Sequence, residues 1–595
     1  MREGLSRPFW LALVIAAFCL PLFIGLGRTD VENDEGIYSY AVDGIVANGD
    51  WMNPLSSPHT EDVFLEKPPL KFWIVALPIR LGLLPDTEFG IRFWDALFGA
   101  VGFLYVFAIG RRLAGPICGV AAVMILFSYG PLLFEHGLRG NNMEAPLFLC
   151  YCGGTYHYIA WADSADQRRR FRHILGVALY FYLGFMTKFV AALFLPVMLA
   201  ATTALLPAAR QRLVSDFSRW VLAAVFVVAL AAPWFVYQQL RVGNQLWRII
   251  FGVHVFERFT TSVDPSHIHP WNYYYAEIIR ELEHMGTAWL ALAGIILLVW
   301  YAVRERRVEA VAVVMWLTVP LALMSVGTSK LHHYAYPFLP PIALAAGFGP
   351  AWVVRVGRQH VESFMKWTQQ WLSQTRPLSE AARKVFLTLA FLALAIAAAT
   401  LITGSLTWKI GNVLILRNSH VSRPLLVALI FATLGGRGVI AARFMFPIAM
   451  LLLVLPGNAY EDAFRRLSLE AHPLRSARDC AMQVRQAELT DGRQAPGIYA
   501  VGEQRWFLHS YYYYLHKVGG WERAATMEPA PLEAALFEPG HQRLVMIGDA
   551  DYRAFKTNHA EALHSVPSVG LREVLLLMPG PYAVCGPPGP ARTHR

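Results

Sequence analysis

A polar stretch that follows the first apolar run carries residues that could do chemistry. Asp34 and Glu35 stand side by side, and Lys67 follows later in a Glu-Lys-Pro-Pro turn. A carboxylate can accept the proton of a hydroxyl nucleophile, and a lysine can neutralise a phosphate leaving group. In the alternative interpretation the acids cap a helix and Lys67 reaches toward lipid headgroups. The residues alone leave both interpretations open.

The segments around these side chains should hold them at a membrane surface. The two prolines after Lys67 fix the backbone, and we expect this lysine to face solvent. Residues 41–51 predict a short amphipathic helix that lies on the membrane. Residues 70–84 are apolar, but the run is too short for a span and contains Lys71 and Arg80. It therefore predicts a second interfacial helix.

The composition indicates a protein embedded in a lipid bilayer. Hydrophobic residues make up 55% of the 595 residues and charged residues only 16%, against roughly a quarter in soluble domains. Runs long enough to cross a bilayer recur from residue 8 to residue 456. We predict a mainly α-helical polytopic protein with about thirteen transmembrane helices. The expected spans lie near residues 8–27, 89–110, 115–134, 142–161, 173–187, 189–206, 220–237, up to 304, up to 327, 334–354, 385–403, 424–435 and 439–456.

The basic residues indicate how the chain is oriented. The net charge is +10, and arginines gather in short loops at 168–172 and 304–307. Such loops are typical of the cytoplasmic side, so membrane orientation explains the charge better than a nucleic-acid partner does. An odd number of spans then places Met1 in the cytoplasm and the C-terminal tail outside it. The first apolar run has no cleavage site and is interpreted as the first span.

This topology predicts two domains. Residues 1–456 form the transmembrane domain, with 28–85 as its long outer loop. Residues 457–595 alternate helical stretches with short apolar runs, which predicts a small extracytoplasmic α/β domain. Cys480 and Cys585 both fall in this tail, and a disulfide between them is left open.

The ordered motifs of the outer loop resemble those of one enzyme family. They are Asp34-Glu35 with Tyr38, Gly49-Asp50-Trp51, and Phe64–Leu70 with Trp73. This order is similar to the first outer loop of the C-superfamily (GT-C) membrane glycosyltransferases. The similar branch holds the protein O-mannosyltransferases and the lipid A aminoarabinose transferase. The resemblance implies transfer of a sugar from a polyprenyl-phosphate donor to an acceptor, and it extends to about residue 340.

Further residues match this family's motifs near the outer face. Glu144, in a tight turn before a span, matches an acidic residue of the family and would position the acceptor or a cation, unless it only pairs with Arg139. Lys188 and Lys330 match family lysines and would contact the donor phosphate, although Lys188 could simply reach toward headgroups. Arg258, in a His-x-x-x-Arg-Phe element, could hold the phosphate with two hydrogen bonds.

A divalent metal is a weaker expectation. His267 and His269 form a His-x-His pair that could bind a metal together with Glu66. No third ligand lies close to the pair in sequence, so no cofactor is firmly predicted.

These observations favour one function over an alternative of another class. The expected protein is a glycosyltransferase of the bacterial inner membrane, with Asp34, Glu35 and Glu144 as catalytic candidates. Its acceptor would be a hydroxyl of a glycolipid, lipopolysaccharide or protein, and the configuration at the anomeric carbon would invert. The alternative is a transporter or flippase of lipid-linked saccharides. Transporters tend to show internal repeats and charges at mid-membrane, whereas the ionisable residues here collect at the outer interface.

Overall fold

The computed structural model describes residues 16, 19–31, 34–55, 63–257, 260, 265–352, 379–403, 406–410 and 413–418, with short segments between 420 and 577. The chain divides into two compact units. The first comprises Met1–Ile24, Leu97–Leu138 and Glu144–Leu469, and the second Gly25–Ala96, Arg139–Met143 and Glu470–Arg595. The outer loop and the C-terminal tail therefore belong to the same unit.

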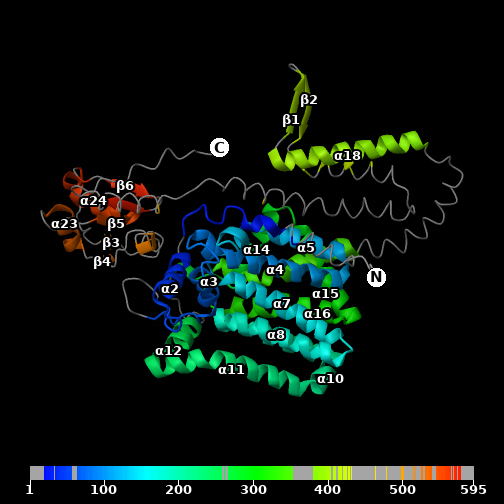
Figure 1. The fold of residues 1–595 in the computed structure, drawn as a ribbon, viewed down its shortest axis with the longest axis horizontal. Coiled ribbons are helices and arrows are strands. Elements are labelled where there is room, and N and C mark those ends of the chain that lie inside the picture. The colour runs from blue at the N-terminus through cyan, green and yellow to red at the C-terminus, as the bar shows by residue number, and fades with distance from the viewer. Residues whose placement is uncertain are drawn as a thin grey trace. The chain divides into compact units, whose positions relative to one another are not determined.

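The first unit is a helical bundle. Its longer helices are α4 (Glu88–Ala114, from Leu97 onward), α5 (Pro116–Ser128), α6 (Gly130–Phe134), α7 (Glu144–Asp163), α8 (Gln167–Lys188), α9 (Val190–Leu205), α10 (Pro207–Ser215), α11 (Phe217–Val242), α14 (Tyr273–His284), α15 (Ala288–Glu305), α16 (Val308–Val326) and α18 (Glu380–Thr403). Shorter turns are η1 (Leu20–Phe23), α12 (Gln245–Trp247), η2 (Arg248–Glu257), η3 (Pro265–His267) and η4 (His332–Phe338), and residues 339–352 are also helical. Helices α7, α8 and α16 run side by side (Figure 1).

Small residues allow these helices to approach closely. A Cβ atom on Gly153 of α7 would stand 2.6 Å from the Tyr180 ring of α8, and one on Gly154 would stand 2.7 Å from Leu195 of α9. Glycines at such contacts are typical of helices packed within a membrane. Phe189, with φ 32°, separates α8 from α9, so the tight turn predicted at Lys188 is present one residue later.

Five described helices are long and apolar enough to cross a membrane: α4, α11, α15, α16 and α18. A sixth span is added if the bent pair α9 and α10 counts as one. The expected span at 439–456 lies outside the described residues, as do half of 8–27 and most of 424–435. A polytopic helical membrane protein is therefore established, whereas the number thirteen stays a prediction.

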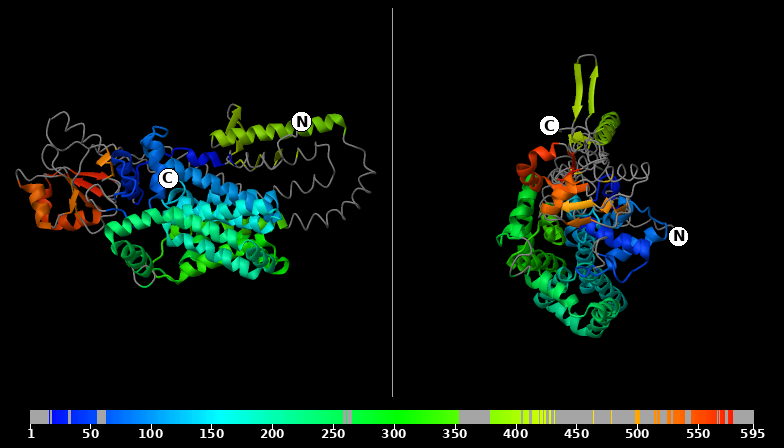
Figure 2. Two further views of the ribbon diagram at one scale, coloured as in Figure 1. Left: turned by 60° about the horizontal axis from the view of Figure 1, so that its bottom comes forward. Right: turned by 90° about the vertical axis from the view of Figure 1, so that its left-hand side faces the viewer.

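A β-hairpin after α18 was not predicted. Strands β1 (Leu406–Ile410) and β2 (Val413–Asn418) pair antiparallel and extend beyond the end of α18 (Figure 2). Both strands are rich in leucine, isoleucine, valine and threonine, and the register shifts between Trp408 and Lys409.

The second unit contains the outer-loop helices α2 (Asp34–Asn48) and α3 (Leu70–Arg80). Helix α3 confirms a helix within the segment 70–84, and its position at the membrane interface stays a prediction. The prediction of an amphipathic surface helix over 41–51 is wrong, because α2 begins at Asp34 and most of its side chains are buried. One reason is that the ring of Tyr513, from the tail, packs on Tyr40 with centroids 5.7 Å apart.

The tail contributes a mixed sheet to this unit. Its strands are β3 (Ile498–Val501), β4 (Ala524–Thr526), β5 (Leu544–Gly548), β6 (Ser568–Leu571) and β7 (Val574–Leu577), in the order β4-β3-β5-β7-β6. Strand β3 is parallel to β4 and β5, and β7 is antiparallel to β5 and β6. Helices α23 (Pro529–Phe537) and α24 (Asp549–Leu563) bury Leu536 and Leu563 with Val545 of the sheet.

Candidate active site

Glu35 is locked into a buried ion pair at the start of α2. Its carboxylate accepts two hydrogen bonds from Arg92, from Nε at 2.6 Å and from Nη2 at 2.7 Å. The backbone N–H of Asn141 donates a third at 2.8 Å. Arg92 also donates to the carbonyl oxygens of Leu26 and Asp30, which hold the chain just before the helix. Glu35 is therefore an anchor whose lone pairs are already occupied.

Asp34 has a different environment although it is the adjacent residue. It is the first residue of α2 and is only partly buried. Within the described residues its side chain makes no hydrogen bond and no ion pair. Of the two acids, Asp34 is the one available to accept a proton.

Lys67 lies on a turn that packs against α2. Its side chain is 10% exposed and its Nζ is 4.0 Å from a carboxylate oxygen of the exposed Glu66. The expectation of a solvent-facing lysine is therefore wrong. An aromatic cluster lies just before this turn, where Phe64 meets Tyr38 of α2 at 6.0 Å and Phe72 of α3 at 5.7 Å between ring centroids. This cluster joins the turn of Lys67 to the first turns of the helix that carries Asp34.

A second buried charge pair supports the same region. Lys71 and Asp95 are both fully buried and form an ion pair of 2.5 Å. Lys71 also donates to Asn141 Oδ1 at 2.9 Å, and Asn141 Nδ2 donates to Ser39 at 3.2 Å. Residues 139–143 thus connect to α2 and α3 through the amide of Asn141.

The sequence pattern does not reveal the pairs of Arg92 with Glu35 and of Asp95 with Lys71. Arg92 and Asp95 lie within the predicted span 89–110, and Lys71 lies in the predicted interfacial helix. The available signal was the cost of burying a charge in a membrane segment, which usually requires a partner or a function.

Besides the ring of Tyr513, three polar side chains of the C-terminal tail contact this region. The hydroxyl of Tyr514 accepts a hydrogen bond from the backbone N–H of Val31 at 2.8 Å and donates to Glu88 at 3.1 Å. Arg478 also pairs with Glu88, at 2.7 Å. Lys517 Nζ lies 2.7 Å from Asp43 Oδ1 of α2 and 2.5 Å from Asp86 Oδ1. We call Arg478, Tyr514 and Lys517 the tail clamp.

Burial and the tail clamp act in opposite directions on Asp43. Burial raises the pKa of Asp43 and the Lys517 ammonium lowers it, with a net rise from 3.8 to about 6. The same contact works on the lysine in reverse: burial alone would lower the pKa of Lys517, but Asp43 raises it. The pair is thus charged at neutral pH.

In the first unit, two predicted site residues come together. Lys188 at the end of α8 forms an ion pair with Glu144 at the start of α7. The Lys188 ammonium also lies 4.6 Å from the centroid of the Tyr334 ring, and His333 Nε2 is 3.7 Å from Glu144 Oε1. Glu144 and Lys188 are therefore ion-pair partners. Glu144 does not pair exclusively with Arg139, which was the alternative interpretation of its sequence.

Lys330 connects two loops of the first unit. Its ammonium donates to the carbonyl oxygen of His269 at 2.9 Å and also to that of Gly327. Its backbone N–H donates to the carbonyl of His267 at 2.8 Å, beside an isolated β-bridge between Ile268 and Ser329. Burial lowers the pKa of Lys330. These bonds favour a structural role over contact with a donor phosphate.

The remaining candidates are Arg258 and the metal ligands. Arg258 lies outside the described residues. The ring of His269 stacks on Tyr273 with centroids 4.0 Å apart. In the described part of the chain, no three His, Cys, Asp or Glu side chains gather as a metal site would require. Glu66, His267 and His269 therefore stay an unsupported metal candidate.

Comparison with known proteins confirms the resemblance seen in the loop motifs. Residues 66–237 match the family described as dolichyl-phosphate-mannose-protein mannosyltransferase. An undecaprenyl phosphate-alpha-4-amino-4-deoxy-L-arabinose arabinosyl transferase of Pseudomonas fluorescens Pf0-1 is 30% identical over 321 residues, covering 53% of this chain and 52% of that protein. Its counterpart in strain Pf-5 is 27% identical over 319 residues, covering 53% and 51%. The matched region thus spans about half the length of these curated relatives.

The fold has a solved counterpart. The crystal structure of ArnT from Cupriavidus metallidurans bound to undecaprenyl phosphate aligns with a TM-score of 0.60 at 19% identity, covering 97% of this chain and 100% of that one. At this identity the likeness establishes the fold alone. Together with the sequence matches, it makes this chain similar to the GT-C membrane glycosyltransferases of the aminoarabinose transferase branch.

Proposed function

We propose that this chain, a relative of the aminoarabinose transferases, is an integral membrane glycosyltransferase. It takes a sugar from a polyprenyl-phosphate donor and transfers it to a hydroxyl of a glycolipid, lipopolysaccharide or protein at the outer face of the membrane. The names of the relatives make undecaprenyl phosphate the first choice of carrier and a pentose the first choice of sugar.

The observation that carries this proposal is the contrast between two adjacent acids. Glu35 is held by Arg92 and by the backbone of Asn141. Asp34 lies in the same first turn of α2, yet its own carboxylate makes no hydrogen bond and no ion pair within the described residues. A general base needs this combination, since it must be fixed in position while its lone pairs stay available.

The reaction would be a single displacement at the anomeric carbon. Asp34 takes the proton of the acceptor hydroxyl as that oxygen forms its bond to the anomeric carbon. The bond from the same carbon to the phosphate oxygen breaks, and the electron pair leaves with the polyprenyl phosphate. The configuration at the carbon inverts. No nucleotide is consumed, because the lipid phosphate is already the activated leaving group.

Lys67 is the residue we assign to the leaving phosphate. Its turn is joined to α2 through the ring contact between Phe64 and Tyr38. A partly desolvated ammonium stabilises developing negative charge more strongly than one in bulk water. The pair of Glu144 and Lys188 is a second polar group, which we assign to positioning of the acceptor.

The proposed orientation is Met1 in the cytoplasm and the tail outside it, in a bacterial inner membrane. The tail clamp supports this, because Lys517 and Asp43 are in contact and so belong on the same side of the membrane. The arginine loops at 168–172 and 304–307 then face the cytoplasm.

The proposal is tested with the purified full-length protein in lipid nanodiscs. Undecaprenyl-phosphate pentose and hexose donors are supplied with lipid A or an acceptor peptide, and mass spectrometry follows both the product and free undecaprenyl phosphate. Transfer predicts that the two appear in equal amounts. The same protein in sealed proteoliposomes tests the alternative: movement of intact donor across the bilayer, with no free carrier released from any donor, would establish the transporter instead.

A further inference from the structure

The helical bundle of the first unit has a cavity lined by basic residues, which are distant in sequence from Asp34 and Glu35. It measures about 570 Å³ and is lined by Gln167, Arg168, Phe171 and Arg172 of α8 and by Arg219 of α11. Helices α8 and α11 pack side by side, and both begin at this cavity. Their N-terminal N–H groups add positive potential to that of the arginine side chains.

The arginines around this cavity are not equivalent. Asp216, which is buried, accepts hydrogen bonds from Arg170 at 2.7 Å and also pairs with Arg219. Arg169 is 3.5 Å from Asp166. Arg168 and Arg172 stand one helical turn apart, and within the described residues their guanidinium groups have neither a hydrogen bond nor an ion pair. Two uncompensated cations therefore line a cavity whose other arginine is already neutralised.

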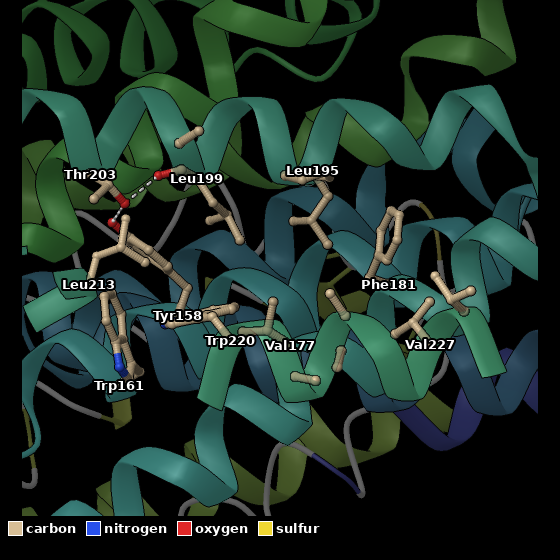
Figure 3. A pocket seen from close by; sticks show the side chains of 16 residues that line it. Tyr158, Trp161, Val177, Phe181, Leu195, Leu199, Thr203, Leu213, Trp220 and Val227 are labelled. Atoms are coloured by element: carbon tan, nitrogen blue, oxygen red, sulfur yellow. Dashed lines mark hydrogen bonds between the residues drawn. The ribbon is translucent and has the colours of Figure 1, made fainter. Parts of the chain in front are cut away.

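An apolar cavity continues along the same two helices. It measures about 390 Å³, and its walls include Val177 and Phe181 of α8 and Trp220 and Val227 of α11. Figure 3 shows these side chains directed toward one another. Trp220 follows Arg219 directly in the chain, so each of the two cavities is lined in part by the N-terminal end of α11. On its outward side α11 exposes Leu222, as expected of a helix that contacts lipid.

We infer that this pair of cavities binds one anionic phospholipid of the membrane. The headgroup phosphate is held by Arg168 and Arg172, and an acyl chain follows the groove between α8 and α11. The charge of the first cavity and the apolar character of the second match the two ends of such a lipid. Basic pockets between membrane helices are known to accept headgroups of this class. The inference does not depend on the proposed sugar transfer, because it concerns only the membrane in which the chain lies.

The test is native mass spectrometry of the full-length protein with equal amounts of cardiolipin, phosphatidylglycerol and phosphatidylcholine. The variant R168Q/R172Q should lose bound cardiolipin or phosphatidylglycerol by roughly tenfold to thirtyfold, because each basic group near an anionic lipid contributes about a fivefold factor. The matched control is R210Q/R306Q, which removes the same charge from exposed arginines outside the cavity. The control should retain lipid as the wild type does.

The apolar half has its own variant. Ala224 is exposed and lines the groove, whereas Val225 is exposed but does not line it. A224F should reduce retention of the anionic lipid and V225F should not. If R168Q/R172Q and R210Q/R306Q lose anionic lipid equally, general charge attraction explains the binding, and this result would overturn the proposed site. Equal retention of phosphatidylcholine, or displacement of the lipid by undecaprenyl phosphate, would also overturn the assignment to an anionic phospholipid.

Discussion

At the scale of single residues, the two adjacent acids differ in their contacts, and we propose that Glu35 anchors α2 whereas Asp34 does the chemistry. The Glu35 carboxylate accepts hydrogen bonds from Arg92 and from the backbone of Asn141, and these bonds fix the direction of the first turn of α2. Asp34 lies in the same turn and is oriented with it, but it does not bond to Arg92 or Asn141. Substitutions at the two positions should therefore damage different properties of the protein.

Asp34→Asn should lower the rate of transfer about a hundredfold to ten-thousandfold, because the amide keeps the shape but cannot take the proton. Insertion and unfolding temperature should stay as in the wild type. Initial rates of product formation in nanodiscs measure the first effect, and fluorescence-detected gel filtration checks the second. Rates within a few-fold of the wild type would remove Asp34 as the base.

Glu35→Gln should act mainly on stability. It leaves the Arg92 guanidinium buried without a counter-charge, and loss of one partner of a buried pair costs about 3–5 kcal/mol. The apparent unfolding temperature should fall, and activity should fall in step with the folded fraction. If the variant is as stable as the wild type and yet inactive, Glu35 rather than Asp34 is the base.

Two lysines four positions apart offer a matched comparison. Lys67→Ala should raise the apparent KM for the polyprenyl-phosphate donor about tenfold to a hundredfold, as expected for loss of one charge-assisted hydrogen bond. Lys71→Ala should instead prevent folding, since it strands the fully buried Asp95. Donor titrations at fixed acceptor measure the first change. An unaltered KM in a folded Lys67→Ala protein would exclude contact with the donor phosphate.

The sequence identifies the candidate residues of this site, but it does not identify the residues that surround them in the folded protein. Asp34, Glu35 and Lys67 were all recognisable, and the fold is consistent with an organised loop around them. Their surroundings depend on Arg92 and Asn141, which are distant in sequence and meet Glu35 only after folding. The turn that carries Lys67 is likewise joined to α2 by ring packing between separate segments. Local pattern cannot supply contacts of this kind.

At the scale of elements, the tail clamp stabilises the helix that carries the acids. Lys517 contacts Asp43 three turns into α2, and Tyr514 holds the backbone just before its start at Val31. Sequence patterns predicted α3 well because its apolar run is continuous. They misplaced α2, because its polar residues are covered by the tail rather than by water.

Lys517→Met should lower the unfolding temperature at neutral pH but not at acidic pH. In the wild type, stability from Asp43 falls as pH rises from about 4 to about 6, because the raised pKa favours the protonated form in the folded state. Above pH 6 the ammonium of Lys517 offsets the buried charge. The variant should match the wild type closely at pH 5 and lose unfolding temperature at pH 7.5.

The control for that experiment is the double variant D43N/K517M. It has no carboxylate to ionise at position 43, so its unfolding temperature should change little between pH 5 and pH 7.5. A pH-independent loss in Lys517→Met would instead assign the effect to Asp86, whose carboxylate also contacts Lys517.

At the scale of the whole molecule, the proposed orientation can be tested with reporters. A reporter fused after Arg595 that is active only in the cytoplasm should be silent, and one active only outside should be functional. A second reporter inserted at the arginine loop 304–307 should give the opposite result. Cytoplasmic activity of the C-terminal fusion would contradict the proposed topology and the odd span count with it.

The tail clamp also has a consequence for when the protein can first work. Val31 and Tyr514 are 483 positions apart, so the loop leaves the ribosome long before its partner is made. At about 5–20 residues per second, this delay is roughly 25 to 100 seconds. During that interval α2 has no tail to cover it. A nascent or prematurely terminated chain would therefore carry Asp34 and Glu35 on a helix without its tail contacts. We expect such a chain to be inactive until the full length has been synthesised.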